Sequence, residues 1–285
     1  MSKKWSLFKN LPERSSRIIA LDTETTGGNS EDNHILEIAA IEIINGFITG
    51  KIFHLYIKPR RKINYGAFMV HKIHDEFYNE YYKDFYESDK ENMKKLVEFI
   101  GNDSYIIAHN ADFDMNFLNY ELKFWNLPNI FERKFRCSFH IFQNLFKNVD
   151  AFKSEIQGYS LKKCSRFFRI KVNTQGLHSA LYDATLLAKL ICSIYLFLEK
   201  NPEYLLNRKI ENLSQFREKQ VFSNNNNNNT DNKDNKKNIN NIKTFDKYKY
   251  NNSNTNTNTN SNTNTNSNSN TNTNSNFTQN KTNLN

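Results

Sequence analysis

The chain has 285 residues, of which 38% are hydrophobic and 14% aromatic, and its formal net charge at pH 7 is +9. From Phe222 onward it consists mostly of Asn, Thr and Ser, so only about the first 200 residues can supply a folded core. The tail holds seven Lys and three Asp, which leaves a net charge of +5 on residues 1–221. This basic balance favours a polyanionic partner such as nucleic acid.

Cysteine usage and hydropathy argue against a disulfide-bonded protein and against a membrane-spanning one. Cys137, Cys164 and Cys192 lack the spacing of a metal site and lie in apolar patterns, so we expect buried thiols in a reducing compartment. No apolar run approaches the roughly 20 residues of a membrane span. The N-terminus has no signal-peptide core, and a short basic organelle-targeting segment before Arg17 is left open.

The N-terminal part of the chain has the pattern of three strands. Arg17–Asp22 is apolar and β-branched, His34–Asn45 alternates and is rich in Ile, and Phe53–Ile57 ends before a proline. Gly27–Asn33 is a polar turn. Three strands joined by short turns predict an antiparallel meander.

Behind the meander, helical and strand patterns alternate. The expected elements are a short helix or structured loop at Ala67–Ile73, a helix at Asn92–Ile100, a strand at Tyr105–Ala108, a helix capped by Asp112, a strand at Phe135–Phe139 that continues as a helix to about Phe146, a helix from the Ser160 cap through Phe168, and a long amphipathic helix spanning Ala184 to Leu198. This order predicts an α/β fold with a mixed sheet flanked by helices.

Composition divides the chain into four parts. We expect an irregular lead-in at 1–16, the folded domain at 17–200, a peripheral charged segment at 201–221 and a low-complexity Asn-rich tail at 222–285. The tail cannot bury enough apolar surface to offset its chain entropy, so we expect it to be disordered.

Two carboxylates follow the first strand. Asp22 and Glu24 stand two residues apart, and side chains at that spacing on a strand point to the same face. Two such charges about 4 Å apart repel by roughly 4 kcal/mol at an effective dielectric constant of about 20. A divalent metal would relieve that repulsion, whereas an acidic strand end in a solvated turn explains the pair equally well.

A second acidic cluster, HNADFD, spans His109–Asp114 and opens a helix directly after a strand. Both acids could simply cap the helix and complement its dipole. We accept that reading for Asp112. Because one cap is enough, Asp114 is the better candidate to point across the sheet end toward Asp22.

The third pair is His178 and Asp183. Positions five apart on a helix are about 140° apart, so they cannot share one helical face. We therefore expect His178 on the loop after Gly176 and Asp183 inside the helix, next to the apolar ladder that begins at Ala184. A carboxylate near a core is costly unless a charge meets it.

The motifs DTETTG, HNADFD and H-x₄-D, in this order, resemble the three exonuclease motifs of the DEDDh 3′–5′ exonucleases. The resemblance runs from about Arg17 to Leu198 and is strongest to the epsilon proofreading subunits of bacterial DNA polymerase III. Supporting stretches are GKIFHLYIKP, VHKIHDEF, IAHNADFDMNFLNYEL, YSLKKCSRFF and GLHSALYDA. The resemblance implies a ribonuclease H-like mixed five-stranded sheet flanked by helices.

The resemblance also implies roles for individual residues. Two Mg²⁺ or Mn²⁺ ions would be held by Asp22, Glu24, Asp114 and Asp183. His178 would be the general base that takes a proton from the attacking water. The substrate would meet Thr25, Thr26, His71 and His109, with Phe68 or Val70 wedged against the terminal base. The chain departs from the family at Asp112, where a small residue is frequent, at Cys137, where Asp is frequent, and in its Asn-rich tail.

Three functions remain open at this point. The leading hypothesis is a proofreading or repair exonuclease on DNA, with a polymerase catalytic subunit as partner and no membrane. A 3′ trimming ribonuclease would use the same metal chemistry. A non-catalytic replisome subunit would use its tail for recruitment, although Gln220–Phe222 only faintly resembles a clamp motif. We expect a cytoplasmic, bacterial-type replisome, with the nucleus or an organelle left open.

Overall fold

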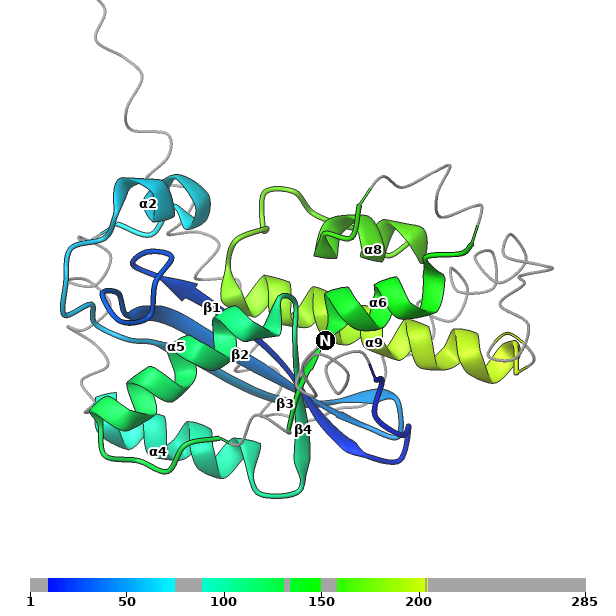
Figure 1. Ribbon diagram of the computed structural model, residues 1–285, viewed down its shortest axis with the longest axis horizontal. Helices are drawn as coiled ribbons and strands as arrows, with labels where there is room; N and C mark the ends of the chain where they lie inside the picture. The colour runs from blue at the N-terminus through cyan, green and yellow to red at the C-terminus, as the bar shows by residue number, and fades with distance from the viewer. Residues whose placement is uncertain (1–9, 75–88, 131–133, 150–157, 203, 205–285) are drawn as a thin grey trace, which may run out of the picture. The chain divides into compact units, whose positions relative to one another are not determined.

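A computed structural model describes residues 10–74, 89–130, 134–149, 158–202 and 204 (Figure 1). In chain order the elements are β1 (Arg17–Thr25), β2 (Ile35–Ile44), β3 (Phe47–Tyr56), α2 (Tyr65–His71), α4 (Asp89–Ile100), β4 (Ser104–Ala108), α5 (Ala111–Phe124), β5 (Phe135–Cys137), α6 (Ser138–Phe146), α8 (Leu161–Phe167) and α9 (Ala180–Lys200). The expected tail at 222–285 and nearly all of the 201–221 segment lie outside the described residues.

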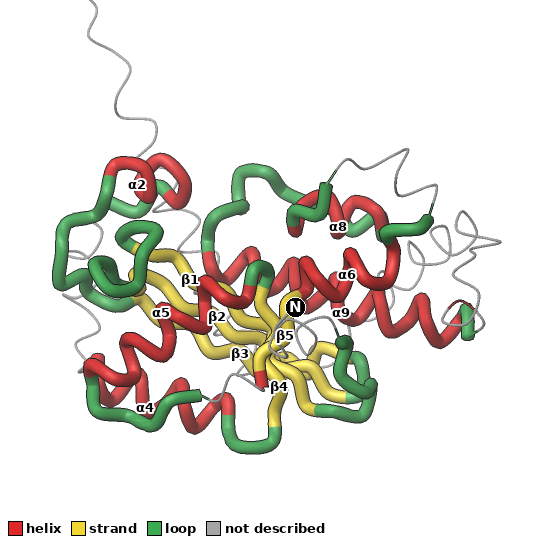
Figure 2. The backbone as a smooth tube through the Cα atoms, viewed as in Figure 1, coloured by secondary structure: helices red, strands yellow, loops and turns green. Residues whose placement is uncertain are grey.

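The strands form one mixed sheet in the order β3-β2-β1-β4-β5 (Figure 2). β1 pairs antiparallel with β2, and β2 antiparallel with β3, which is the predicted meander. β4 runs parallel to β1, and β5 parallel to β4. The predicted α/β fold with a mixed five-stranded sheet is therefore confirmed, and β1 lies at its centre.

Helices pack on both faces of β1. α4 and α5 contribute to the core on the face that carries Ile19 and Leu21. α9 packs against β1 and β2, on the face where the alternating pleat places Asp22 and Glu24. A strand that is covered on both faces has a continuous apolar sequence, and for this reason the first part of β1 could be predicted from the sequence.

An aromatic cluster joins α6, α8 and α9. Its members are Phe142, Phe146, Phe167, Phe168, Phe197 and Tyr204. The fully buried Phe146 ring has its centroid 4.6 Å from that of Phe142, 5.3 Å from that of Phe167 and 5.5 Å from that of Phe197. These tilted and edge-on contacts fix α6 and α8 on the long helix.

Several element boundaries differ from the sequence prediction. β1 continues to Thr25, so Glu24 as well as Asp22 lies within the strand. β3 begins at Phe47; its first half is exposed, and it therefore lacks the apolar pattern that marks the second half. β5 ends at Cys137, where α6 begins directly. α2 begins two residues earlier than expected and ends at His71.

The start of α5 corrects the role expected of Asp112. The helix begins at Ala111, and Asn110 takes the cap position with a left-handed backbone, φ 72°. Asp112 therefore lies in the first turn, where its charge complements the helix dipole as expected, but the prediction that it caps the helix was wrong. Asn tolerates the left-handed region better than most residues, so the turn is made one residue before the helix. The Ser160 cap is confirmed, since its side chain accepts a hydrogen bond from the Lys163 amide at 3.4 Å.

Helix α9 is long and apolar enough to cross a membrane by length and composition alone, with a mean hydropathy of 1.6. However, 67% of that window is buried inside the protein, as in the core helix of a folded domain. In the sequence this segment is not a continuous apolar run, because Asp183 and Lys189 interrupt it. The expected burial of the thiols holds for Cys137 and Cys164, whereas Cys192 is half-buried.

The aromatic cluster predicts a large stability effect. Phe146→Ala should lower the free energy of unfolding by about 3–5 kcal/mol, because it removes a fully buried ring and leaves a cavity. Urea denaturation measures the change. Phe47→Ala is the control: that ring is 62% exposed and meets only the Arg14 guanidinium among the contacts described for it, so the cost should be about 1 kcal/mol or less. Equal costs for the two variants would contradict a stabilising cluster.

Candidate active site

β1 presents two of the four carboxylates. Asp22 is half-buried and Glu24 is buried, and both point to the α9 face. Their partners on β2 are Ala39, which is small, and Glu37. The pairing register shifts between Glu24 and Thr25, an irregularity of the kind that redirects side chains next to active sites.

The third carboxylate, Asp114, comes from the first turn of α5. This helix follows β4, which is parallel to β1, so both strands deliver their following residues to the same edge of the sheet. Asp114 is 3% exposed, and the Thr23 hydroxyl donates a hydrogen bond to its Oδ1 at 2.8 Å. The contact fixes the carboxylate at the end of β1, close enough to Asp22 for their charges to interact.

The fourth carboxylate and the histidine come from the start of α9. Asp183 is buried in the first turn, and His178 is exposed on the preceding loop, as the five-residue spacing predicted. The backbone N–H of His178 donates to Asp183 Oδ2 at 2.8 Å. One ligand atom each of Glu24, His178 and Asp183 lie within 4.8 Å of one another, a grouping that could hold a metal ion.

The electrostatics of the site favour a bound cation. Burial raises the pKa of Asp22 well above its ordinary value, and the charges of Asp114, Asp183, Glu24 and Glu37 raise it further. Burial likewise raises the pKa of Asp114 to about 7, against the opposing effect of the Thr23 hydrogen bond. Carboxylate oxygens are the ligands that Mg²⁺ and Mn²⁺ prefer, and a divalent ion would offset the mutual repulsion. The donor set therefore fits such ions.

A fifth acidic side chain, Glu37, supports the site from β2. It is fully buried, and its Oε1 accepts hydrogen bonds from His54 Nε2 at 2.9 Å, the Tyr56 hydroxyl at 3.2 Å and the Ser179 hydroxyl at 3.1 Å. The last contact ties the start of α9 to the sheet. Sequence reasoning missed this residue, although an acid inside the apolar run ILEIAAI was a signal that could have found it.

The two threonines expected to meet the substrate shape the end of β1. The Thr25 hydroxyl donates to the Gly27 carbonyl at 2.7 Å. The Thr26 hydroxyl is fully buried; it donates to Asn33 Oδ1 at 3.2 Å and accepts from the His34 amide at 2.9 Å. Both hydroxyls are thus used inside the loop, and the Thr26 backbone is bonded there as well, since its amide donates to the His34 carbonyl at 2.8 Å and its carbonyl accepts from the Asn64 amide at 2.9 Å.

The two accessory histidines make contacts within the protein. His71 is buried; its Nε2 donates to the Thr25 carbonyl at 3.2 Å and its Nδ1 accepts from the Ile73 amide at 3.0 Å, so α2 is anchored to the end of β1. His109 Nδ1 lies 2.8 Å from the Ser138 hydroxyl. Burial lowers the pKa of His109 to about 4, so this ring is neutral at pH 7. The two wedge candidates differ, since Phe68 is half-buried and Val70 is exposed.

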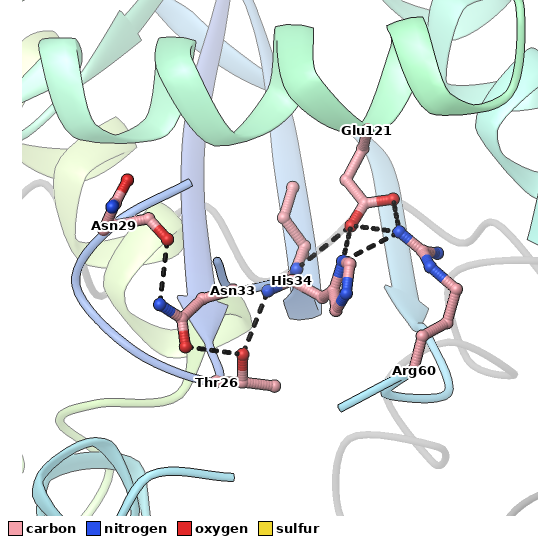
Figure 3. A network of polar contacts seen from close by, with 7 residues as sticks. Thr26, Asn29, Asn33, His34, Arg60 and Glu121 are labelled. Carbon is pink, nitrogen blue, oxygen red and sulfur yellow. Dashed lines mark hydrogen bonds and ion pairs between the residues drawn. The ribbon is translucent and has the colours of Figure 1, made fainter. Parts of the chain in front are cut away.

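A polar network fixes the loop between β1 and β2 to α5 (Figure 3). Glu121 of α5 is fully buried, and Arg60 donates to both of its carboxylate oxygens, at 2.9 and 2.8 Å. Arg60 also donates to His34 Nδ1 at 2.9 Å, and its guanidinium carbon lies 3.9 Å from the centroid of the Phe124 ring. Burial, with the nearby Arg60 charge, lowers the pKa of His34. Nothing in the sequence indicated this network, because its members are far apart along the chain.

Comparison with known proteins agrees with the family that the motifs indicate. The family model described as Exonuclease, RNase_T, matches residues 19–191. DNA polymerase III subunit epsilon of Buchnera aphidicola subsp. Schizaphis graminum is 38% identical over 215 residues, which cover 71% of this chain and 83% of the relative. The corresponding subunit of Escherichia coli K12 is 34% identical and covers 61% of this chain and 69% of the relative.

Solved structures support the fold. E. coli exonuclease I in complex with a dT13 oligonucleotide superposes with a TM-score of 0.51 at 15% identity, over 70% of this chain and 45% of that one. Exonuclease I from Methylocaldum szegediense gives the same TM-score over 66% of this chain and 41% of that one. At such identity the likeness concerns the fold alone. The matched domain and the epsilon relatives decide the family: the chain belongs to the RNase_T exonuclease family, as an epsilon-like DEDDh 3′–5′ exonuclease.

Proposed function

We propose that this exonuclease removes 3′-terminal nucleotides from DNA as nucleoside 5′-monophosphates and serves as the proofreading subunit of a DNA polymerase. The observation that carries the proposal is the grouping of Glu24 from β1 with His178 and Asp183 from the start of α9, whose ligand atoms lie within 4.8 Å of one another. The charge of Asp22 from β1 interacts with those of Glu24 and Asp183 and with that of Asp114 from α5. No single element could assemble that set.

The carboxylates have a binding role in this proposal. Asp22, Glu24, Asp114 and Asp183 hold two Mg²⁺ or Mn²⁺ ions. Such ions, when bound, stabilise the charge that develops on the phosphoryl oxygens and lower the pKa of the attacking water. Thr23 orients Asp114 through its 2.8 Å hydrogen bond, and the sheet holds the β1 pair in place.

His178 is the proposed general base. Its side chain is exposed at the mouth of the site, while its backbone is fixed by the hydrogen bond to Asp183. Imidazole is the side chain whose ordinary titration range spans neutral pH, so it can accept a proton from water and release it to solvent in each turnover.

The substrate lies against the end of β1 and helix α2. We assign the 3′-terminal nucleotide to the segment of Thr25 and Thr26 and to His71, which anchors α2 there. His109 is neutral at pH 7 and would meet the substrate as an uncharged ring. The exposed Val70, or Phe68, is the wedge against the terminal base.

The wider assignment rests on the relatives, which are named as subunits of DNA polymerase III. We propose a polymerase catalytic subunit as partner and a bacterial-type cytoplasmic replisome as the setting. Within the chain, we assign the chemistry to residues 17–200. The lead-in at 1–16, the charged segment at 201–221 and the tail at 222–285 would then take no part in hydrolysis.

A direct assay tests substrate and polarity. The full-length chain with Mn²⁺ should release 5′-monophosphates from the 3′ end of single-stranded DNA, and faster from a mispaired than from a paired primer terminus, because a frayed end reaches the site without unpairing. Asp114→Asn is the inactive control. Faster release from RNA of the same sequence would instead support a 3′ trimming ribonuclease. No release from either polymer would leave only a non-catalytic role.

Metal binding should be visible in stability. Millimolar Mn²⁺ should raise the melting temperature by about 5–10 °C if it exceeds the dissociation constant about 100-fold, since it binds only the folded state. Asp22→Asn should melt higher than the parent without metal, because a repelled buried charge is gone, and should lose most of the Mn²⁺ shift. An unchanged melting temperature of the parent with Mn²⁺ would rule out the site.

The raised pKa values also predict a pH effect on the metal-free protein. Asp114 titrates at about 7 when folded and near its ordinary value of 3.8 when unfolded, so the folded state binds more protons between those values. The free energy of unfolding in EDTA should therefore fall as pH rises from about 4 to about 7 and then level off. Asp114→Asn should make that slope shallower, and the remainder belongs to Asp22, whose pKa is also raised. Urea titrations at several pH values measure it, and a slope that the substitution leaves unchanged would contradict the raised pKa of Asp114.

Removal of His178 separates chemistry from folding. His178→Asn should lower kcat by about 10²–10⁴-fold, the range for a lost general base, with an unchanged Mn²⁺ shift. Asn is the better substitute because His178 has φ 66°, which Asn tolerates. His178→Ala should lose the same activity but melt about 2–4 °C lower through backbone strain of about 1 kcal/mol. The rate of the parent should rise with pH near neutrality as the general base loses its proton, and this rise should be absent in both variants. Near-normal turnover in His178→Asn would contradict the assignment.

A further inference from the structure

We propose that Tyr182 is a positioning residue for the hydrolysis, which acts by holding the loop of residues 173–179, here called the His178 loop, so that His178 faces the carboxylates. This inference rests on the proposed role of His178 as general base. It adds a residue that lies outside the four carboxylates and the histidine of the motifs.

The first contact lies at the start of the loop. The Tyr182 hydroxyl accepts a hydrogen bond from the Asn173 amide at 2.6 Å. Asn173 in turn organises the next residues, since its Oδ1 accepts from the Gln175 amide at 3.1 Å and its carbonyl from the Gly176 amide at 3.2 Å. One phenol oxygen therefore anchors a compact turn five residues before His178.

The second contact is between the loop and the tyrosine ring. A Cβ built on Gly176 would lie 2.9 Å from Cδ2 and 3.1 Å from Cγ of Tyr182. Real Cβ atoms essentially never come that close, so the backbone lies against the ring at a distance that only glycine permits. The ring of Tyr182 thus fixes the position of the loop backbone at Gly176, two residues before His178.

The third set of contacts fixes the end of the loop. The His178 amide donates to Asp183 Oδ2, and the Ser179 hydroxyl donates to Glu37 Oε1 at 3.1 Å. His178 itself has a left-handed backbone, a conformation that persists only where the surroundings enforce it. Adjacent residues of α9, Tyr182 and Asp183, therefore hold the two ends of one loop.

This geometry makes turnover sensitive to the Tyr182 hydroxyl while stability is not. Asn173 is exposed, so water can replace the phenol oxygen as acceptor for its amide. The loop would keep its Asp183 contact but lose the fixed start. A base displaced by about 1 Å can cost up to about 100-fold in rate, which is far more than such a change costs in folding.

The test is a double-mutant cycle in the full-length chain. Tyr182→Phe should lower kcat about tenfold with KM changed less than about twofold, and with the melting temperature and Mn²⁺ shift of the parent. In the His178→Asn background the same substitution should have no further effect, because there is no base left to position. Tyr120→Phe, at another half-buried tyrosine on α5, is the matched control and should keep full activity.

A second variant tests the ring contact. Gly176→Ala places a methyl group against the ring and should lower kcat at least as much as Tyr182→Phe, again only when His178 is present. If His178→Asn keeps normal turnover, the general-base role of His178, on which this inference rests, is wrong. If His178→Asn loses turnover but Tyr182→Phe and Gly176→Ala do not, or if their effects multiply with it, the positioning role of Tyr182 is wrong and the general base stands.

Discussion

Four carboxylates held at one partly buried sheet edge repel one another, and the rest of the domain has to keep them in place against that repulsion. Burial and mutual repulsion raise the pKa of Asp22, and burial raises that of Asp114. Side chains on flexible loops would move apart and take up water. Here they come instead from a strand at the centre of the sheet and from the first turns of two helices.

Two further buried carboxylates support the domain in different ways. Glu121 lies seven residues beyond Asp114 along α5 and is met by Arg60, so its burial adds little net negative charge. Glu37 lies next to Glu24 across the strand pair and adds to the field at Asp22. Its hydrogen bonds to Tyr56 and Ser179 hold the start of α9 on the sheet. The same carboxylate therefore strains the site and orders it, and a bound cation would relieve the strain.

The core away from the site has to offset this strain. β1 is covered on both faces, and the aromatic cluster around Phe146 joins three helices. Such packing is stable at any pH at which the site titrates. The domain thus separates a pH-independent core from a pH-dependent sheet edge, and the two meet in α9, which contributes Phe197 to the cluster and Asp183 to the site.

The sequence by itself determined the order and nature of the strands, the shared face of Asp22 and Glu24, and the loop position of His178. Each follows from a local periodicity: two residues per repeat in a strand and 3.6 in a helix. The motifs also identified the family, which the comparisons confirm. Local pattern failed at Asn110, which turns the chain into α5 two residues before the expected cap at Asp112.

Only the tertiary structure decided which other residues serve the site. The contact of Glu37 with Ser179 joins positions 142 apart, and that of Arg60 with Glu121 joins positions 61 apart. The approach of Gly176 to Tyr182 is shorter in sequence, but it depends on the path of a loop that no periodicity describes. Hydrogen bonds and close packing between distant segments depend on how the chain is folded back on itself, and a linear pattern of apolar and polar residues does not contain that information.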